Sequence, residues 1–254
     1  MKIIDTHAHL QSEEFNAILD NVIKRLGIVE KVFLATSYIN DIKKACEIAH
    51  KYDNLYFFAG IHPHHASEFK IGDLDIIENY LKDEKCIGIG EIGLDYFYNY
   101  APKDTQKTLF SNLLDFAIYH NKWVSIHIRD ATKDAIDILS TKKNLKAIIH
   151  CFNGDLDLLK LALDKNYLLG IGGVVTFKNS LIRQNITKVP LKNMVLETDA
   201  PYLAPVPKRG KTNEPSFLQY TINALGDLLG IEIKEIAQIT YANGLRVLND
   251  KQLF

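Results

Sequence analysis

Two histidines near the start of the chain have the spacing of a metal-binding pair. Residues 5–9 read Asp-Thr-His-Ala-His at the end of a short apolar run that is typical of a β-strand. Side chains two residues apart in a strand point to the same face, so His7 and His9 can bind one divalent ion together. Asp5 shares that face and could orient one of these ligands. The alternative is a pair of surface histidines that begins a loop.

Two more histidines, His127 and His150, stand at the ends of other predicted strands. In the strand of His127, the apolar residues Val124 and Ile126 alternate with polar ones. This pattern is expected when one face of a strand meets helices and the other lines the upper part of a barrel. A single histidine on such a strand is more often a hydrogen-bonded core residue than a ligand. Four histidines at the ends of three strands instead favour a metal centre.

Acidic residues occupy equivalent positions on two further strands. Glu91 lies on one face of a predicted strand that leads to Asp95, and Glu197 and Asp199 share a face of another. An inward carboxylate is costly to bury unless it is paired or binds a metal. We therefore expect Glu91 and Asp199 to be ligands, and Glu197, one step deeper, to orient one. Four imidazoles and two carboxylates exceed the needs of a single ion, so a bridging carboxylate could let two ions share the site.

Five further residues are candidates for binding substrate. They are His62, Asp95, Arg129, Lys208 and Arg209. His62 could reach a phosphate or cap a turn, and Arg129 could bind an anion or pair with a buried carboxylate. Lys208 and Arg209 could form a basic lip over the site, although such a cluster is more often a solvated loop.

Aromatic residues are concentrated after the predicted strand that carries Glu91. They are Tyr96, Phe97, Tyr98 and Tyr100. Aromatic rings of this kind can stack on nucleobases, as in proteins that bind single strands. They can equally serve as hydrophobic cover for the loop, and the sequence leaves both interpretations open.

Short β-rich runs alternate with longer amphipathic segments along the whole chain. The predicted strands are residues 2–6, 31–36, 55–60, 86–90, 123–128, 146–150, 167–171 and 194–198. The helical patterns include residues 15–26, 42–52, 106–120, 134–139, 156–163 and 217–229. Eight strands, each followed by a helix-sized segment, predict a single (β/α)8 TIM barrel domain over residues 1–254, with the active site at its C-terminal mouth. A doubly wound open sheet is the second choice, because no GxGxxG motif follows the first strand.

The composition excludes several classes of protein. Of the 254 residues, 47% are hydrophobic, and 30 basic side chains balance 31 acidic ones. This composition excludes a disordered chain and argues against a protein that coats nucleic acid by charge alone. Three scattered cysteines do not make a disulfide framework, and the longest apolar run, residues 167–177, is too short to span a bilayer. We therefore expect a cytoplasmic protein with no membrane contact, and no obligate protein partner is evident.

Seven motifs, in chain order, resemble the TatD family of metal-dependent hydrolases, which belongs to the amidohydrolase-like barrels. The motifs are DTHAHL (5–10), GIHPHH (60–65), GEIGLDYF (90–97), SIHIR (125–129), HCFNG (150–154), ETDAPYLAP (197–205) and RGKTNEPSFL (209–218). A His-x-His pair alone is common to many barrel hydrolases, whereas GEIGLDY, HCFNG and ETDAPYL together are specific to this family.

The resemblance implies two divalent ions, which could be magnesium, manganese or zinc. One ion would be bound by His7, His9 and Asp199, the other by His127 and His150, with Glu91 as the bridge between them. The family is associated with DNase activity, often trimming DNA from a 3′ end, and other members with removal of D-amino acids from tRNA. The resemblance therefore predicts a deoxyribonuclease, a 3′–5′ exonuclease whose substrate is single-stranded DNA or another nucleic acid.

Metal-assisted hydrolysis of a phosphodiester is the reaction that we expect from this ligand set. Two ions would acidify a water and stabilise charge on the phosphoryl oxygens, and Asp199 would be both ligand and base. The same water could attack a carbonyl, so the main alternative is an ester or amide hydrolase, including a D-aminoacyl-tRNA deacylase. A non-catalytic binding barrel is a third hypothesis, which the complete ligand set disfavours.

Overall fold

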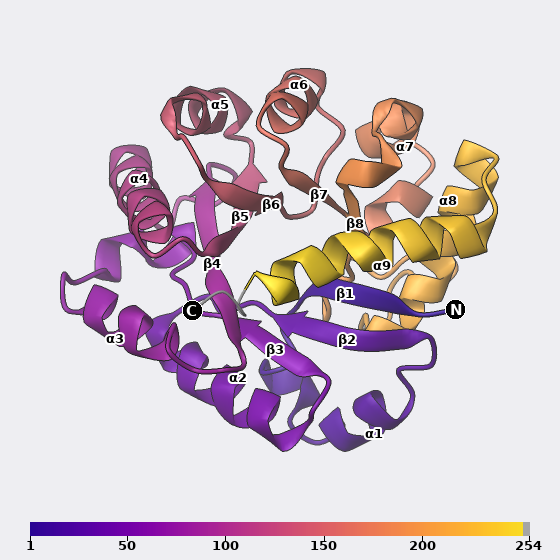
Figure 1. The fold of residues 1–254 in the computed structure, drawn as a ribbon, viewed down its shortest axis with the longest axis horizontal. Coiled ribbons are helices and arrows are strands. Elements are labelled where there is room, and N and C mark those ends of the chain that lie inside the picture. The colour runs from indigo at the N-terminus through magenta and orange to yellow at the C-terminus, as the bar shows by residue number, and fades with distance from the viewer. Residues whose placement is uncertain (251–254) are drawn as a thin grey trace. The chain divides into compact units, whose positions relative to one another are not determined.

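Eight strands alternate with helices along the chain in a computed structural model that describes residues 1–250. The strands follow one another through one sheet in the order β1 to β8 (Figure 1). The described residues fall into two units: a terminal unit, made of Met1–Leu34 and the chain from Cys151 onward, and a central unit, Ala35–His150. The single domain over residues 1–254 stays a prediction, and its last four residues lie outside the described part.

Each unit contributes four strands to the sheet. The terminal unit holds β1 (Ile3–Ala8), β2 (Val29–Leu34), β7 (Leu168–Ile171) and β8 (Met194–Leu196). The central unit holds β3 (Leu55–Phe58), β4 (Cys86–Asp95), β5 (Trp123–Arg129) and β6 (Lys146–Ile149). The order of strands and their alternation with helices confirm the predicted (β/α)8 fold class.

The helices follow the same division. The terminal unit holds α1 (Leu19–Lys24), α6 (Leu156–Asp164), α7 (Leu181–Asn185), α8 (Leu218–Leu229) and α9 (Ile233–Asn249). The central unit holds α2 (Ile39–Lys51), α3 (Asp73–Tyr80), α4 (Lys103–Tyr119) and α5 (Thr132–Thr141). Short 3₁₀ helices are η1 (Glu13–Phe15), η2 (Pro63–Glu68), η3 (Gly173–Thr176), η4 (Ile186–Lys188), η5 (Leu191–Asn193) and η6 (Pro215–Phe217). No α-helix among residues 1–250 combines the length and apolar character needed to cross a bilayer.

In the terminal unit, the last strand lies beside the first. The backbone N–H of His9 donates to the carbonyl of Ala200 at 2.7 Å, and the N–H of Asp199 donates to the carbonyl of His7 at 2.9 Å. These bonds continue the β1–β8 pairing beyond the end of β8. They therefore place the His-x-His pair next to Asp199, although 190 residues or more separate them in the chain.

Helix α9 (yellow in Figure 1) covers β1 and β8 of the same unit. The chain comes close to β1 at Gly244, where an added Cβ would lie 3.0 Å from the side chain of Ile4. The side-chain amide of Asn243 donates to the carbonyls of Leu191 and Met194, at 2.9 and 2.8 Å. A buried polar side chain thus satisfies the backbone at the start of β8 and fixes the helix against the strand.

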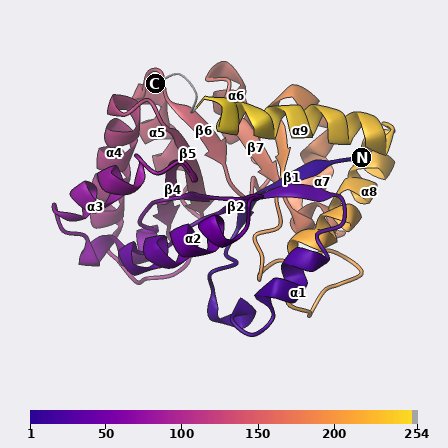
Figure 2. The same ribbon diagram turned by 60° about the horizontal axis from the view of Figure 1, so that its bottom comes forward.

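In the central unit, β4 and β5 approach each other closely beside His127. Gly93 of β4 pairs with His127 in the ladder and has a φ of 149°, a region that side chains with a Cβ rarely adopt. A Cβ at Gly93 would overlap the carbonyl oxygen of His127, so only glycine permits this approach. The N–H of His150 donates to the carbonyl of Ile126 at 2.9 Å, which places His150 directly after β6. Helices α4 and α5 lie side by side on this unit (Figure 2).

All eight predicted strands are present, with shifted ends. The largest difference is in β4, which was expected to end at Gly90 but continues to Asp95, because the pairing with β5 runs on to Arg129. Glu91 and Asp95 therefore both lie within the strand. Helices α3, α7 and α9 lie outside the helical patterns named from the sequence.

Arg25, which follows α1, forms an ion pair with Glu214, the residue before η6. Its Nε lies 2.9 and 2.8 Å from the two carboxylate oxygens of Glu214, and its Nη2 lies 2.6 Å from one of them. Burial would raise the pKa of Glu214, but hydrogen bonds from Arg25 and Ser216 outweigh it and lower the pKa below its ordinary value. The ion pair therefore contributes stability at neutral pH that is lost as the pH falls through the lowered pKa.

We expect Arg25→Ala to lower the free energy of unfolding by about 1–2 kcal/mol at about pH 7, since Glu214 loses its charged partner. The difference from the unchanged chain should shrink as the pH falls toward about 3. Urea titrations at both pH values measure it. Lys43→Ala, which removes an exposed partner 3.9 Å from Glu47, is the matched control and should have almost no effect. A loss of stability that is equal at both pH values would contradict the ion pair as its cause.

Candidate metal centre

Histidines and carboxylates gather into one group in each unit. The terminal ligand group consists of His7, His9 and Asp199. The central ligand group consists of Glu91, His127 and His150. These six residues are the ligands expected from the sequence.

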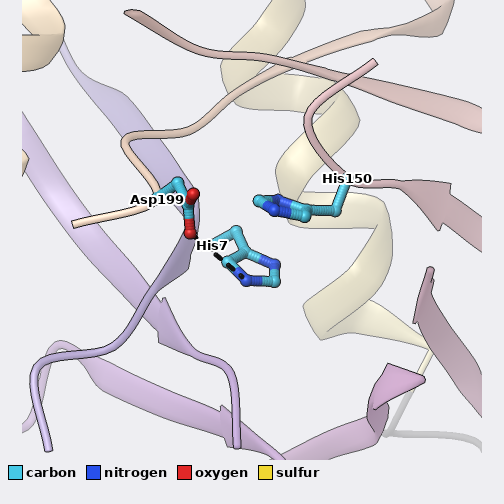
Figure 3. A group of neighbouring side chains, drawn as sticks. All are labelled: His7, His150 and Asp199. Atoms are coloured by element: carbon cyan, nitrogen blue, oxygen red, sulfur yellow. Dashed lines mark ion pairs between the residues drawn. The ribbon is translucent and has the colours of Figure 1, made fainter. Parts of the chain in front are cut away.

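The terminal ligand group brings three potential ligand atoms together. The Nε2 atoms of His7 and His9 lie 3.3 Å apart, and Oδ1 of Asp199 lies 3.5 Å from His9 Nε2 and 4.0 Å from His7 Nε2. Figure 3 shows His7 and Asp199 with their polar atoms directed toward each other. Ligands at about 2.1 Å from a tetrahedral ion lie about 3.4 Å apart, so the donor set and its spacing fit a divalent metal.

A buried carboxylate holds the backbone on both sides of this group. Asp5 accepts hydrogen bonds from the N–H and the hydroxyl of Thr198, at 2.9 and 2.6 Å, and from the N–H of His7 at 3.3 Å. Burial raises the pKa of Asp5 to about 7, against the effect of these hydrogen bonds. Because Thr198 precedes Asp199, Asp5 fixes the strand segments that carry the ligands rather than the imidazole rings themselves.

Asp199 and Glu197 differ in their surroundings. Asp199 has a φ of 58°, the left-handed region that aspartate tolerates better than most residues, so the chain turns three residues after the end of β8. Its side chain is 15% exposed. Glu197 is fully buried and accepts the N–H of Cys151 at 2.5 Å. This bond reaches the backbone, and the expectation that Glu197 orients a ligand stays a prediction.

The central ligand group is arranged around one carboxylate oxygen. Oε1 of Glu91 lies 2.8 Å from His127 Nδ1, 3.7 Å from His150 Nε2 and 3.8 Å from His62 Nε2. The ligand atoms that Glu91, His127 and His150 offer all lie within 4.8 Å of one another. A mixture of imidazole and carboxylate donors at this spacing fits zinc or manganese, and its imidazoles make magnesium a weaker fit.

Asp95 supports His127 from the other side of the ring. Its Oδ2 lies 3.1 Å from His127 Nε2 and 2.9 Å from His64 Nε2. Burial opposes a charge on His127, but hydrogen bonds to Asp95 and Glu91 outweigh it and raise the pKa of His127 to about 8. Burial would likewise raise the pKa of Asp95, yet its bonds with His127, the N–H of Tyr98 and His64 hold that pKa well below its usual range. Asp95 was a candidate for binding substrate. In the structure its carboxylate is bonded to the imidazoles of His127 and His64.

His62 and His64 belong to the turn at the start of η2. Nδ1 of His62 accepts the N–H of His64 at 3.2 Å, so His62 caps the turn, while its Nε2 faces Glu91. His64 was not among the expected site residues. The signal that could have found it is the histidine-rich motif around Pro63, whose members come together through a 3₁₀ turn rather than a strand.

The basic residues of the loop before α8 lie over aromatic rings. Nζ of Lys208 is 5.3 Å from the ring centre of Phe217 and 5.5 Å from that of Tyr220. The guanidinium of Arg209 is 4.0 Å from the ring centre of Phe177. The structure thus places both cations in cation–π contacts, and the basic lip expected from the sequence stays a prediction.

The bond between Thr198 and Asp5 gives a test of how the terminal ligand group is held. We expect Thr198→Val to weaken metal binding by this group about tenfold, because outer hydrogen bonds of this kind typically contribute at least that much. Competition with a chromophoric chelator, in a His127→Ala background that weakens the central group, measures the Kd. Thr108→Val, which removes an exposed hydroxyl bonded to the carbonyl of Asp104, is the control. Equal Kd values for the two variants would show that the hydroxyl bond from Thr198 to Asp5 does not help to position the ligands.

Comparison with known proteins places this arrangement among metal-dependent hydrolases. Residues 4–249 match the family model described as TatD-related DNase. The uncharacterised metal-dependent hydrolase YabD of Bacillus subtilis is 37% identical over 250 residues, which cover 96% of this chain and 98% of that protein. YcfH of Escherichia coli K12, described in the same words, is 30% identical over 258 residues, covering 98% of this chain and 96% of YcfH.

Solved structures show the same fold. The crystal structure of YjjV, a TatD homologue from Escherichia coli K12, superposes with a TM-score of 0.90 and 26% sequence identity, covering 97% of this chain and 98% of that one. A TatD-family hydrolase from Entamoeba histolytica superposes with a TM-score of 0.85 at 23% identity, over 97% of this chain and 98% of that one. The second likeness supports the fold alone.

Proposed function

This chain belongs to the family of TatD-related DNases and is a metal-dependent hydrolase, and from that premise we propose that it hydrolyses phosphodiester bonds of DNA. The observation that carries the proposal is the pair of ligand groups, each with its donor atoms already at the spacing a divalent ion requires. We propose trimming of single-stranded DNA from its 3′ end as the specific reaction.

In this proposal each ligand group holds one divalent ion. His7, His9 and Asp199 would bind the first ion, and Glu91, His127 and His150 the second. Ions bound in this way supply an acidified water and positive charge for the phosphoryl oxygens. The nitrogen-rich donor sets support zinc or manganese over magnesium.

Residues of the chain would accept the proton, orient a ligand and bind the substrate. Asp199 is partly exposed and lies beside the imidazole of His9, so it can accept the proton of an attacking water while it stays oriented. Asp95 binds Nε2 of His127, which orients the ring so that Nδ1, on the side of Glu91, would be the nitrogen that faces an ion. Arg129, two residues further along β5, is exposed and can meet a phosphate of the substrate.

Glu91→Ala tests the reaction and the ligand group together. We expect it to reduce turnover about 1,000-fold or more and to reduce bound metal, because three imidazole nitrogens lose the carboxylate around which they are arranged. Hydrolysis of 3′- and 5′-labelled single strands, with individual metals added back after chelation, measures turnover and polarity. Glu47→Ala, an exposed change on α2, is the control.

Three outcomes would contradict parts of this proposal. Full activity of Glu91→Ala with unchanged metal content would remove Glu91 from the site. Intact DNA together with release of a D-amino acid from mischarged tRNA would make the protein an ester hydrolase instead. Metal binding without turnover of either substrate would favour a binding function.

A further inference from the structure

Three aromatic side chains are exposed in the segment between β4 and α4. Phe97, Tyr98 and Tyr100 are 55%, 40% and 65% exposed, and we call them the aromatic platform. Tyr96, the fourth aromatic residue of this segment, is different, because its hydroxyl donates to Asp134 at 2.7 Å. Tyr96 therefore fixes the loop, whereas the platform presents large apolar surfaces to solvent, which are uncommon in such a cluster without a ligand.

The platform has the geometry of a stacking site. The rings of Tyr98 and Tyr100 are stacked, with centres 5.4 Å apart and an angle of 24° between their planes. The ring of Phe97 meets Tyr98 edge-on at 4.8 Å. The guanidinium of Arg129 lies 4.0 Å from the ring centre of Phe97 and 5.0 Å from that of Tyr98. Flat aromatic surface beside a cation complements a nucleobase and its phosphate.

One carboxylate connects the platform to the central ligand group. Oδ1 of Asp95 accepts the N–H of Phe97 at 2.9 Å and that of Tyr98 at 3.1 Å, while its Oδ2 is bonded to His127. The ring of His64, also bonded to Oδ2, lies edge-on to the two tyrosine rings, with centres 5.4 and 4.8 Å away. Asp95 and His64 therefore hold the platform close to His127, which is a proposed metal ligand.

We propose that the aromatic platform binds, by stacking, a nucleobase next to the phosphodiester that is cleaved, with Arg129 beside the phosphate. The inference rests on the proposed DNase function and adds to it how the strand is recognised. A single strand is the favoured ligand because both faces of a base inside a duplex are covered by its neighbours. Every base has such a face, so the platform accepts any sequence.

Single strands with and without the terminal bases test this inference. One oligonucleotide is normal, and two others carry an abasic residue at the 3′-terminal or at the penultimate position. For the unchanged protein we expect kcat/KM to fall about 10- to 100-fold with one of the abasic strands, which corresponds to the loss of one stacked base. Tyr98→Ala and Tyr100→Ala should lower activity on the normal strand. On that abasic strand they should be almost as active as the unchanged protein. Tyr98→Phe keeps the ring and should keep the preference for a base.

Tyr119→Ala, which removes an 84% exposed tyrosine at the end of α4, is the matched control and should retain the full preference. Equal rates of the unchanged protein on all three strands would overturn the platform as a base-binding site and leave the DNase proposal intact. Equal losses of the alanine variants on normal and abasic strands would overturn it as well. A protein that cleaves none of the strands would end both proposals.

Discussion

A carboxylate that is buried away from water has to be matched by donors or by positive charge, and this requirement shapes both ligand groups. Four carboxylates are between 0% and 3% exposed: Asp5, Glu91, Asp95 and Glu197. Backbone N–H groups and a hydroxyl bind Asp5, and the N–H of Cys151 binds one oxygen of Glu197, whereas imidazoles surround Glu91 and Asp95. Asp5 and Asp95 thus position His127 and the strand segments that carry His7 and Asp199.

Two of these carboxylates each join two functional elements. Asp5 joins β1 to the residue before Asp199, so the positions of the terminal ligands follow from backbone bonds. Asp95 joins an imidazole ligand to the loop that carries the aromatic platform. In both places a single side chain sets the distance between two functional elements, and little reorganisation should accompany binding.

The sequence predicts the parts of the site that depend on strand geometry and misses those that depend on loops. The period of two in an extended chain is sufficient to place His7 and His9 on one face, and strand ends identify Glu91 and Asp199. No local pattern reveals that His64 shares the carboxylate of Asp95, because a 3₁₀ turn and a separate strand have to meet. Nor does it reveal which cations lie over aromatic rings, since these contacts join distant segments.

The central claim is that the two ligand groups each bind one divalent ion. Chelator-treated protein, reloaded with manganese or zinc and freed of excess metal, can be analysed by mass spectrometry for bound ions per chain. The account predicts two ions in the unchanged protein, one after His9→Ala and one after His127→Ala. An unchanged protein that holds no ion, or variants that both retain two, would contradict it.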